Sequence, residues 1–184
     1  IKIMIENDIV GFAMSAPYSK ELEAQILLQS YNIESFIPLC YKIIERKDGC
    51  KMRKLVPAIH NLIFVKTTRL IIQEVKQRIS ILQFLTKPEN GRNVPIIVPE
   101  RQMQQFITVC KSQNEDLTYL SPTEINLTKG TRVKIIGGPF DGVEGTFIKI
   151  KGYKKRRIVV SLLGIAAVAT AEINPDYIQI IKNN

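Results

Sequence analysis

The stretch that decides the fold of the second half of this 184-residue chain is KGTRVKIIGGPFDGVEGTFIKIKG, from Lys129 to Gly152. Apolar side chains alternate with polar ones on both sides of a glycine-rich centre, which is the pattern of two strands that each bury one face. The centre, Gly137 to Gly142, contains residues that favour a turn. We therefore predict a β-hairpin. Phe140 has no core-facing position in this pattern, so we expect it to be exposed and to anchor a partner.

The remaining residues of the second half continue in the same style. Glycine or proline separates short runs that are rich in β-branched residues, and this spacing predicts a small closed barrel of the SH3-like kind over residues 127–184. An α-helical hairpin is the alternative, but each interior glycine costs a helix about 1 kcal/mol and each proline about 3 kcal/mol. The strands are expected near residues 131–136, 143–151, 157–163, 166–173 and 177–181.

Residues 1–110 mix helical periodicity with apolar runs. Their order predicts an α+β domain in which helices pack on a mainly antiparallel sheet. Lys111 to Asn126 has no periodicity and is rich in polar residues, which predicts a flexible linker over 111–126. Helices are expected at 20–31, 70–78 and from 99 to 110, a hairpin or mobile loop at 45–54, and a loop at 87–93. Strands are expected at 10–14, 33–44 and 81–85, and at 55–65, where the strand is entered through a turn at Pro57.

The composition and motifs favour a negatively charged partner and argue against enzymatic activity. The formal net charge is +9 and the pI is about 9.5, values that suit nucleic acid, a ribonucleoprotein or an acidic membrane surface without choosing among them. Three cysteines without Cys-x-x-Cys spacing and a single histidine, His60, predict neither a disulfide framework nor a metal site. No catalytic motif is present, so we expect no cofactor and no enzymatic activity. Without a targeting segment or a long apolar run, we expect a cytoplasmic protein.

Several segments resemble the NusG family of transcription factors. The hairpin around Gly137 to Gly142 resembles its KOW motif. Tyr18 to Glu21 resembles the Pro-Arg-x-Glu that opens the first helix of its NGN domain, Asn32 to Leu39 resembles Gly-Ile-Glu-x-Phe-x-Pro, and Ile59 to Val65 resembles Phe-Pro-Gly-Tyr-Leu-Phe-Val. Family aromatic, proline and glycine positions are replaced at Gly11, Ile59, His60, Asn61 and Leu62. These departures suggest a specialised paralogue similar to the UpxY, LoaP or RfaH-like antiterminators.

The resemblance implies an NGN domain at 1–110 that binds the RNA polymerase clamp helices and a KOW domain at 127–184 that recruits a small-subunit ribosomal protein or Rho. Such a monomeric factor contacts non-template DNA or nascent RNA, needs no membrane, and suppresses pausing and termination on particular operons. The alternatives are a housekeeping NusG-type factor and a ribosome- or RNA-binding KOW protein. The sequence does not reveal the operons or the recruitment element.

Candidate site residues fall into three sets, each with a plain structural alternative. Apolar side chains on strands are commonly core, and charged side chains are commonly ordinary surface. The resemblance implies polymerase binding by Phe12, Ile59, Leu62 and Phe84, nucleic-acid contacts by Lys20 and Arg78, and KOW-partner binding by Phe140, Leu162, Leu163 and Ile165. The charge pattern alone predicts further nucleic-acid contacts at a basic hairpin tip, by Lys154, Lys155, Arg156 and Arg157.

Overall fold

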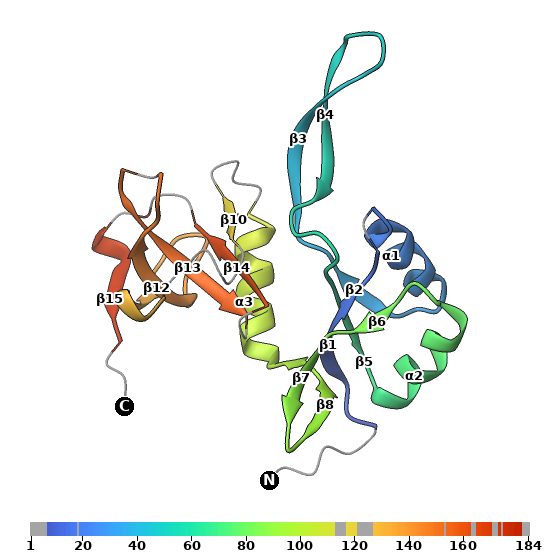
Figure 1. Cartoon of the computed structure of the whole chain (residues 1–184). Helices are drawn as coiled ribbons and strands as arrows, with labels where there is room; N and C mark the ends of the chain where they lie inside the picture. Colours follow the sequence, from blue (N-terminus) through green and yellow to red (C-terminus); the bar gives the residue numbers. More distant parts are fainter. Residues whose placement is uncertain are drawn as a thin grey trace. The chain divides into compact units, whose positions relative to one another are not determined.

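The chain divides into two compact units, Ile1–Glu100 and Arg101–Asn184, and Figure 1 labels most of their elements. This computed structural model describes residues 7–17, 19–112, 117–120, 127–152, 154–162, 165–170, 173 and 175–181.

The first unit is built on an antiparallel sheet with β1 (Val10–Ser15) at its centre. One neighbour of β1 is β5 (Ile63–Thr67), which in turn pairs with β2 (Glu34–Phe36). The short strands β6 (Gln83–Phe84) and β9 (Ile97–Val98) also pair with β1. The sheet therefore joins segments that lie far apart in the sequence, as expected for the predicted α+β domain.

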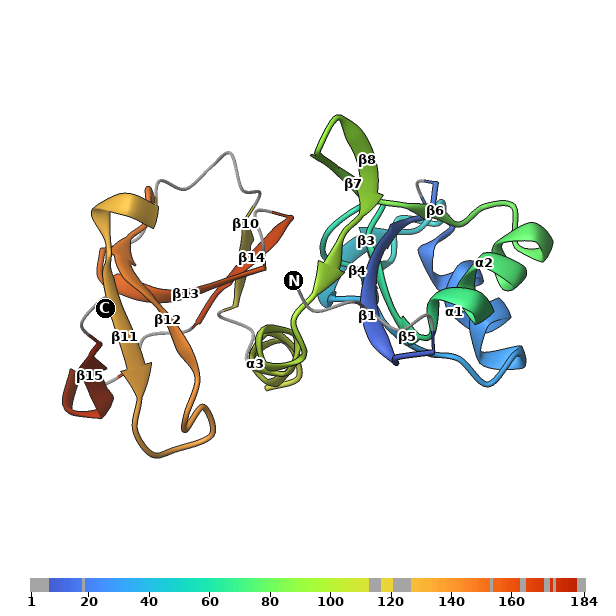
Figure 2. The same ribbon diagram turned by 90° about the horizontal axis from the view of Figure 1, so that it is seen from below.

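Helices α1 (Glu21–Ser30) and α2 (Arg69–Arg78) cover the same face of this sheet, as Figure 2 shows. Their apolar stripes recur at helical spacing, so each helix buries one side against the strands. The backbone N–H of Ile71 donates to the Thr68 hydroxyl at 3.3 Å, which caps the start of α2. The core between helices and sheet includes Phe12, Met14, Ala24, Leu28, Ile63, Val65, Ile72 and Val75.

Two hairpins of the first unit lie outside this sheet. The longer pairs β3 (Leu39–Glu45) with β4 (Lys51–Pro57), and the shorter pairs β7 (Thr86–Glu89) with β8 (Arg92–Pro95). Asn90 and Gly91 have φ values of 50° and 74°, as a two-residue turn between strands requires. The strand predicted at 55–65, entered through a turn at Pro57, is shorter than expected: β4 extends through Pro57, a turn follows at 58–61, and the strand itself is β5. The loop expected at 87–93 is a hairpin.

The second unit contains a six-stranded antiparallel sheet in the order β10-β14-β13-β12-β11-β15. The strands predicted between residues 131 and 181 are present, and no α-helix occurs in the described residues of this range. Closure of the sheet into a barrel stays a prediction. The strands are β10 (Thr118–Leu120), β11 (Thr131–Ile135), β12 (Glu144–Lys149), β13 (Arg156–Leu162), β14 (Ala166–Ala169) and β15 (Ile178–Ile180), with short 3-10 turns at Leu127–Lys129 and Pro175–Tyr177.

From Arg101 on, helix α3 (Glu100–Cys110) belongs to this second unit. Arg101 pairs with Glu144 on β12, and the Gln105 amide donates to the carbonyl of Gly142 at 3.5 Å. Beyond the helix, β10 pairs with β14 over Thr118–Leu120. The prediction of a flexible linker over 111–126 is therefore wrong for residues 118–120. These residues form a strand because their backbone groups hydrogen-bond to β14, although their sequence has no periodicity. The functional bounds 1–110 and 127–184 stay predictions.

The packing of α3 can be tested through its last residue, Cys110. Burial raises the pKa of the Cys110 thiol to about 12, against the partly opposing hydrogen bond from Tyr119. The thiolate is the reactive form, and a rise of three units leaves roughly a thousandfold less of it near neutral pH. We expect a maleimide at about pH 8 to label the exposed Cys50 quickly and the half-buried Cys110 far more slowly until urea unfolds the protein. Equal labelling rates in the folded protein would contradict this packing.

Candidate interaction surfaces

Phe12, the first predicted polymerase contact, lies in the core of the first unit. Its side chain has no exposed surface, and its ring centroid is 5.6 Å from that of Phe84, with the two rings tilted by 56°. The Lys76 ammonium lies 4.6 Å from the centroid of the Phe84 ring, a cation–π distance. Phe84 is partly buried against the same core. Phe12 therefore holds the sheet to its helices, and its side chain presents no exposed surface in this structure.

Leu62 belongs to the other side of the sheet. Side chains alternate along a strand, and Ile63 and Val65 of β5 point into the core beneath α1 and α2. Phe64 and its Cα partner Ala13 consequently face the opposite way. Leu62 lies two residues before Phe64 and therefore falls on the same side of the sheet as Phe64. Leu62 and Phe64 are each 2% exposed.

The four residues predicted to bind polymerase are therefore not brought together on one surface. Phe12 and Phe84 lie on the helix side of the sheet, and Leu62 has the opposite parity. Ile59 lies in the turn between β4 and β5, where it is half-buried. Of the four, only Ile59 and Phe84 retain substantial exposed surface in this structure.

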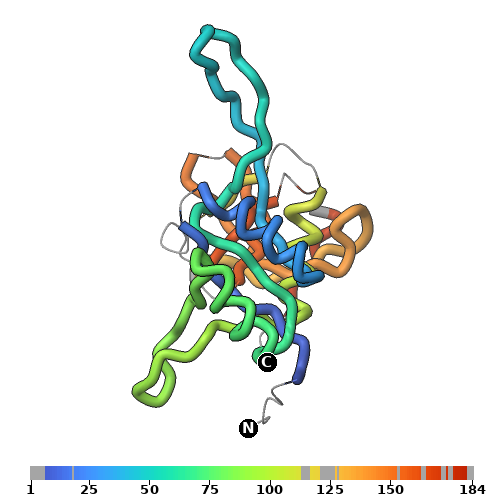
Figure 3. Tube along the Cα trace, turned by 90° about the vertical axis from the view of Figure 1, so that its right-hand side faces the viewer, coloured from blue at the N-terminus to red at the C-terminus, as the bar shows by residue number. Residues whose placement is uncertain are grey.

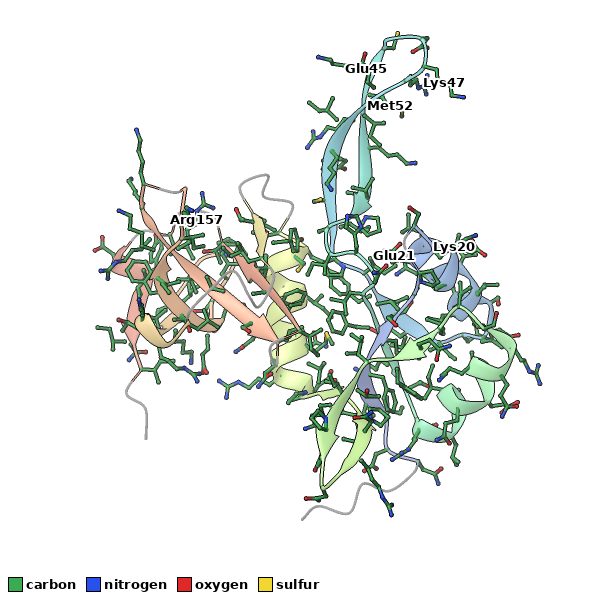
Figure 4. The ribbon with its side chains drawn as sticks, viewed as in Figure 1. Lys20, Glu21, Glu45, Lys47, Met52 and Arg157 are labelled. Atoms are coloured by element: carbon green, nitrogen blue, oxygen red, sulfur yellow. The ribbon has the colours of Figure 1, made fainter. Side chains whose placement is uncertain are left out.

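Glu21 fixes the turn that presents Ile59. Although it is a carboxylate, its side chain is fully buried at the start of α1, where Figure 4 labels it. Oε1 accepts a hydrogen bond of 2.8 Å from the backbone N–H of Asn61, whose φ of 58° lies in the left-handed region. Oε2 is buried and has no hydrogen-bond partner in the described residues. Sequence analysis marked Glu21 only through its resemblance to Pro-Arg-x-Glu and missed this positioning role.

Lys20 and Arg78, the nucleic-acid contacts implied by the resemblance, are exposed. Each forms a helical ion pair on the surface, Lys20 with Glu23 and Arg78 with Glu74. Exposed pairs of this kind contribute about 0–1 kcal/mol. Both cations could therefore exchange their carboxylate for a phosphate at little cost, and their role stays a prediction.

The basic segment of the second unit lies at the β12–β13 hairpin, as its charge pattern predicts. Lys149 is the cross-strand partner of Arg156, and Lys154, Lys155 and Arg156 are exposed. The Arg156 guanidinium is 5.9 Å from the centroid of the Phe147 ring. Like charges on facing positions repel, so an anionic partner would reduce the repulsion between Lys149 and Arg156.

Arg157 differs from its three basic neighbours. It is half-buried, and its guanidinium donates a 2.9 Å hydrogen bond to the carbonyl of Thr170. This contact connects β13 to the residue that follows β14. Arg157 thus has a structural role, although Figure 4 shows it on the same hairpin.

The predicted KOW-partner residues are mostly inside the second unit. Phe140 is only 7% exposed, so the expectation of an exposed anchor is wrong. The turn folds back on itself, because the N–H of Gly142 donates to Ile135 and the N–H of Val143 donates to Phe140, which draws the ring inward. Leu162 has no exposed surface and Ile165 is half-buried. Leu163 lies outside the described residues.

Neither a metal centre nor a membrane span is visible in the described parts of the chain. Among those residues, no three His, Cys, Asp or Glu side chains are grouped so that they could hold a metal ion. None of the described helices is long and apolar enough to cross a membrane.

No protein-family model matches the chain, and no curated protein matches it. Among solved structures, it is similar to that of NusG from Thermotoga maritima, described as showing a domain interaction, with 16% identity, a TM-score of 0.46, and coverage of 95% of this chain and 98% of that chain. It is also similar to the MjSpt4:Spt5 complex in conformation A, with 14% identity, a TM-score of 0.29, and coverage of 95% and 99%. Conformation B gives the same identity and TM-score with coverage of 94% and 97%.

Proposed function

We propose that this chain is a non-catalytic transcription elongation factor that binds RNA polymerase through its first unit. One observation carries the proposal. The segments that resemble the NusG family in sequence, Asn32 to Leu39 and Ile59 to Val65, contribute the adjacent strands β2 and β5, which pair antiparallel with Phe36 opposite Phe64. A chance match of short motifs has no reason to place them side by side in one sheet.

The proposed mechanism uses binding energy alone. A factor that binds the elongating state of a polymerase more tightly than its paused state shifts the population toward elongation. A tenfold shift needs a differential affinity of only about 1.4 kcal/mol. No acid, base, nucleophile or metal is required for this effect.

The turn from Ala58 to Asn61 is the proposed contact point of the first unit. Ile59 is half-buried on this turn and His60 is exposed, while Glu21 holds the backbone from below. A partly exposed apolar side chain on a fixed turn is a suitable anchor for a partner such as the clamp helices of RNA polymerase. This assignment replaces the larger predicted set, since Phe12 and Leu62 are buried and Phe84 packs against the core on the helix side of the sheet.

The proposal extends to antitermination on particular operons, with the second unit recruiting a ribosomal protein or Rho. The basic β12–β13 hairpin supports an acidic or nucleic-acid partner for that unit, because Lys154, Lys155 and Arg156 are all exposed. A housekeeping NusG-type factor and a ribosome-binding KOW protein are the competing assignments.

Capture of RNA polymerase by the tagged full-length chain tests the proposal. We expect the polymerase subunits to co-purify in excess over ribosomal proteins, and Ile59→Glu to reduce capture by about tenfold or more, as loss of an interface anchor does. Ile26→Glu is the matched control, because Ile26 is 67% exposed on α1 of the same unit and its replacement should leave capture unchanged. Capture of ribosomes without polymerase would contradict the proposal and favour the ribosomal alternative.

Transcript mapping and termination assays separate the specialised from the housekeeping assignment. Deletion of the gene should lower the downstream yield of a few operons, and the purified chain should reduce termination in vitro with or without Rho. A genome-wide elongation defect, or termination that the chain stimulates only with Rho, would favour the housekeeping factor.

A further inference from the structure

We propose that the β3–β4 hairpin, residues 39–57, is a DNA-binding arm that enters the major groove of a duplex. We call this segment the basic ribbon. Figures 1 and 3 show it projecting away from the sheet and helices of the first unit. It pairs with no other described strand, and its two strands of seven residues each extend for about 23 Å at the usual rise per residue.

The charge of the basic ribbon points to a polyanion. It contains six basic and two acidic residues, a net charge of +4. The Asp48 carboxylate accepts a 2.9 Å hydrogen bond from the N–H of Cys50 at the tip, and Glu45 stands directly opposite Lys51 across the two strands. At the tip, where Figure 4 labels Glu45, Lys47 and Met52, basic residues outnumber acidic ones.

One cross-strand pair costs the free protein stability. Lys42 on β3 is directly opposite Lys54 on β4, and both side chains are exposed. Like charges at facing positions of an antiparallel pair are destabilising, and an isolated two-stranded hairpin is marginal to begin with. Two phosphates at these positions would convert the repulsion into attraction, so the pair suits an anionic partner better than it suits the fold.

The opposite face of the basic ribbon carries side chains suited to base edges. Tyr41 faces Leu55 and Ile43 faces Arg53 across the strands, and Ile43 is 75% exposed. The Arg53 guanidinium lies 3.9 Å from the centroid of the Tyr41 ring, which stacks the two groups on this face. Arginine reads guanine edges, and apolar side chains contact thymine methyl groups.

Dimensions favour duplex DNA over other nucleic acids. The major groove of B-DNA is about 12 Å wide and admits a two-stranded β-ribbon. The corresponding groove of duplex RNA is too narrow for side chains to enter. A single strand could bind only one face of the ribbon, which would leave either the opposed lysines or the Tyr41 face unused.

The test measures binding of the full-length chain alone to a mixed-sequence DNA duplex of about two helical turns, by fluorescence anisotropy over a range of salt concentrations. We expect Lys42→Gln/Lys54→Gln to weaken binding about 50-fold and to lower the salt slope by about 2, since each phosphate contact contributes about 0.9. The double variant should not unfold the hairpin, because it removes a repulsion.

The matched control is Lys111→Gln/Lys129→Gln, which removes two exposed positive charges from the second unit and should leave the slope nearly unchanged. Duplex RNA and single-stranded RNA and DNA serve as competitors. An equal effect of the two double variants, or tighter binding to any of the competitors than to duplex DNA, would overturn the proposal. Because no polymerase is present, this outcome is independent of the proposed function.

Discussion

Replacing Phe12 by alanine is expected to lower the free energy of unfolding of the first unit by about 3–5 kcal/mol. Phe12 is fully buried on the central strand β1, and its ring packs against Phe84 at 5.6 Å between centroids. Truncation removes this contact and leaves a cavity between the sheet and helices α1 and α2. Such a loss is a large part of the stability of an ordinary domain.

Hydrogen exchange of the β1 and β5 amides in the full-length protein is the suitable measurement, because a chain with two units need not unfold in a single step. Phe12→Leu keeps most of the volume and should cost under about 1.5 kcal/mol. Ile26→Ala removes an exposed side chain and should change stability by no more than about 0.5 kcal/mol. A Phe12→Ala protein with normal exchange but without polymerase capture would show that Phe12 contacts the partner directly, as the resemblance implied.

Replacing Glu21 by alanine is expected to lower the free energy of unfolding of the first unit by about 2–3 kcal/mol. The substitution removes a charge-assisted hydrogen bond and leaves a cavity at a fully buried position. The acceptor of the Asn61 N–H disappears, so the turn carrying Ile59 loses its anchor. Polymerase capture should fall together with the protection of the Asn61 amide, even where the rest of the first unit remains folded.

Glu21→Gln separates the hydrogen bond from the charge. Its amide oxygen can still accept from Asn61, and removal of a buried charge with an unpartnered Oε2 lowers the cost of burial. The loss of a negative charge in the first turn of α1 works against this by about 0.3–1 kcal/mol. We therefore expect the free energy of unfolding of Glu21→Gln to lie within about 1 kcal/mol of that of the unchanged protein, and we expect this variant to retain polymerase capture. Equal destabilisation by alanine and glutamine would show that the charge, rather than the acceptor, holds the turn.

The amino-acid sequence by itself determined most of the secondary structure. Glycine and proline between alternating runs predicted the strands from β11 to β15, which the described residues contain. The helices near 20–31 and 70–78 appear as Glu21–Ser30 and Arg69–Arg78. The reason is physical: period and turn chemistry act over a few neighbouring residues, so they can be read locally.

Segments whose partners are distant in sequence were not predictable in this way. Thr118–Leu120 lacks any strand pattern but pairs with Ala167–Ala169. The pattern at 55–65 predicts a strand entered through a turn at Pro57, but β4 extends through Pro57 and the turn comes after it, because the two parts pair with different strands. Backbone hydrogen bonds to a remote partner decided these elements, and no local property of the segments encodes them.

The sequence thus determined which residues are apolar, basic or turn-forming, and only the tertiary structure decided where their side chains go. Phe140 and Phe12 both match positions that the resemblance gives to partners, yet both are buried, because the Phe140 turn folds inward and the Phe12 side of β1 faces two helices. Glu21 is a charged residue that became internal through a hydrogen bond to a turn forty residues away. The exposed ribbon at 39–57 depends in the same way on pairing, since facing lysines are identified only once the register of the two strands is set.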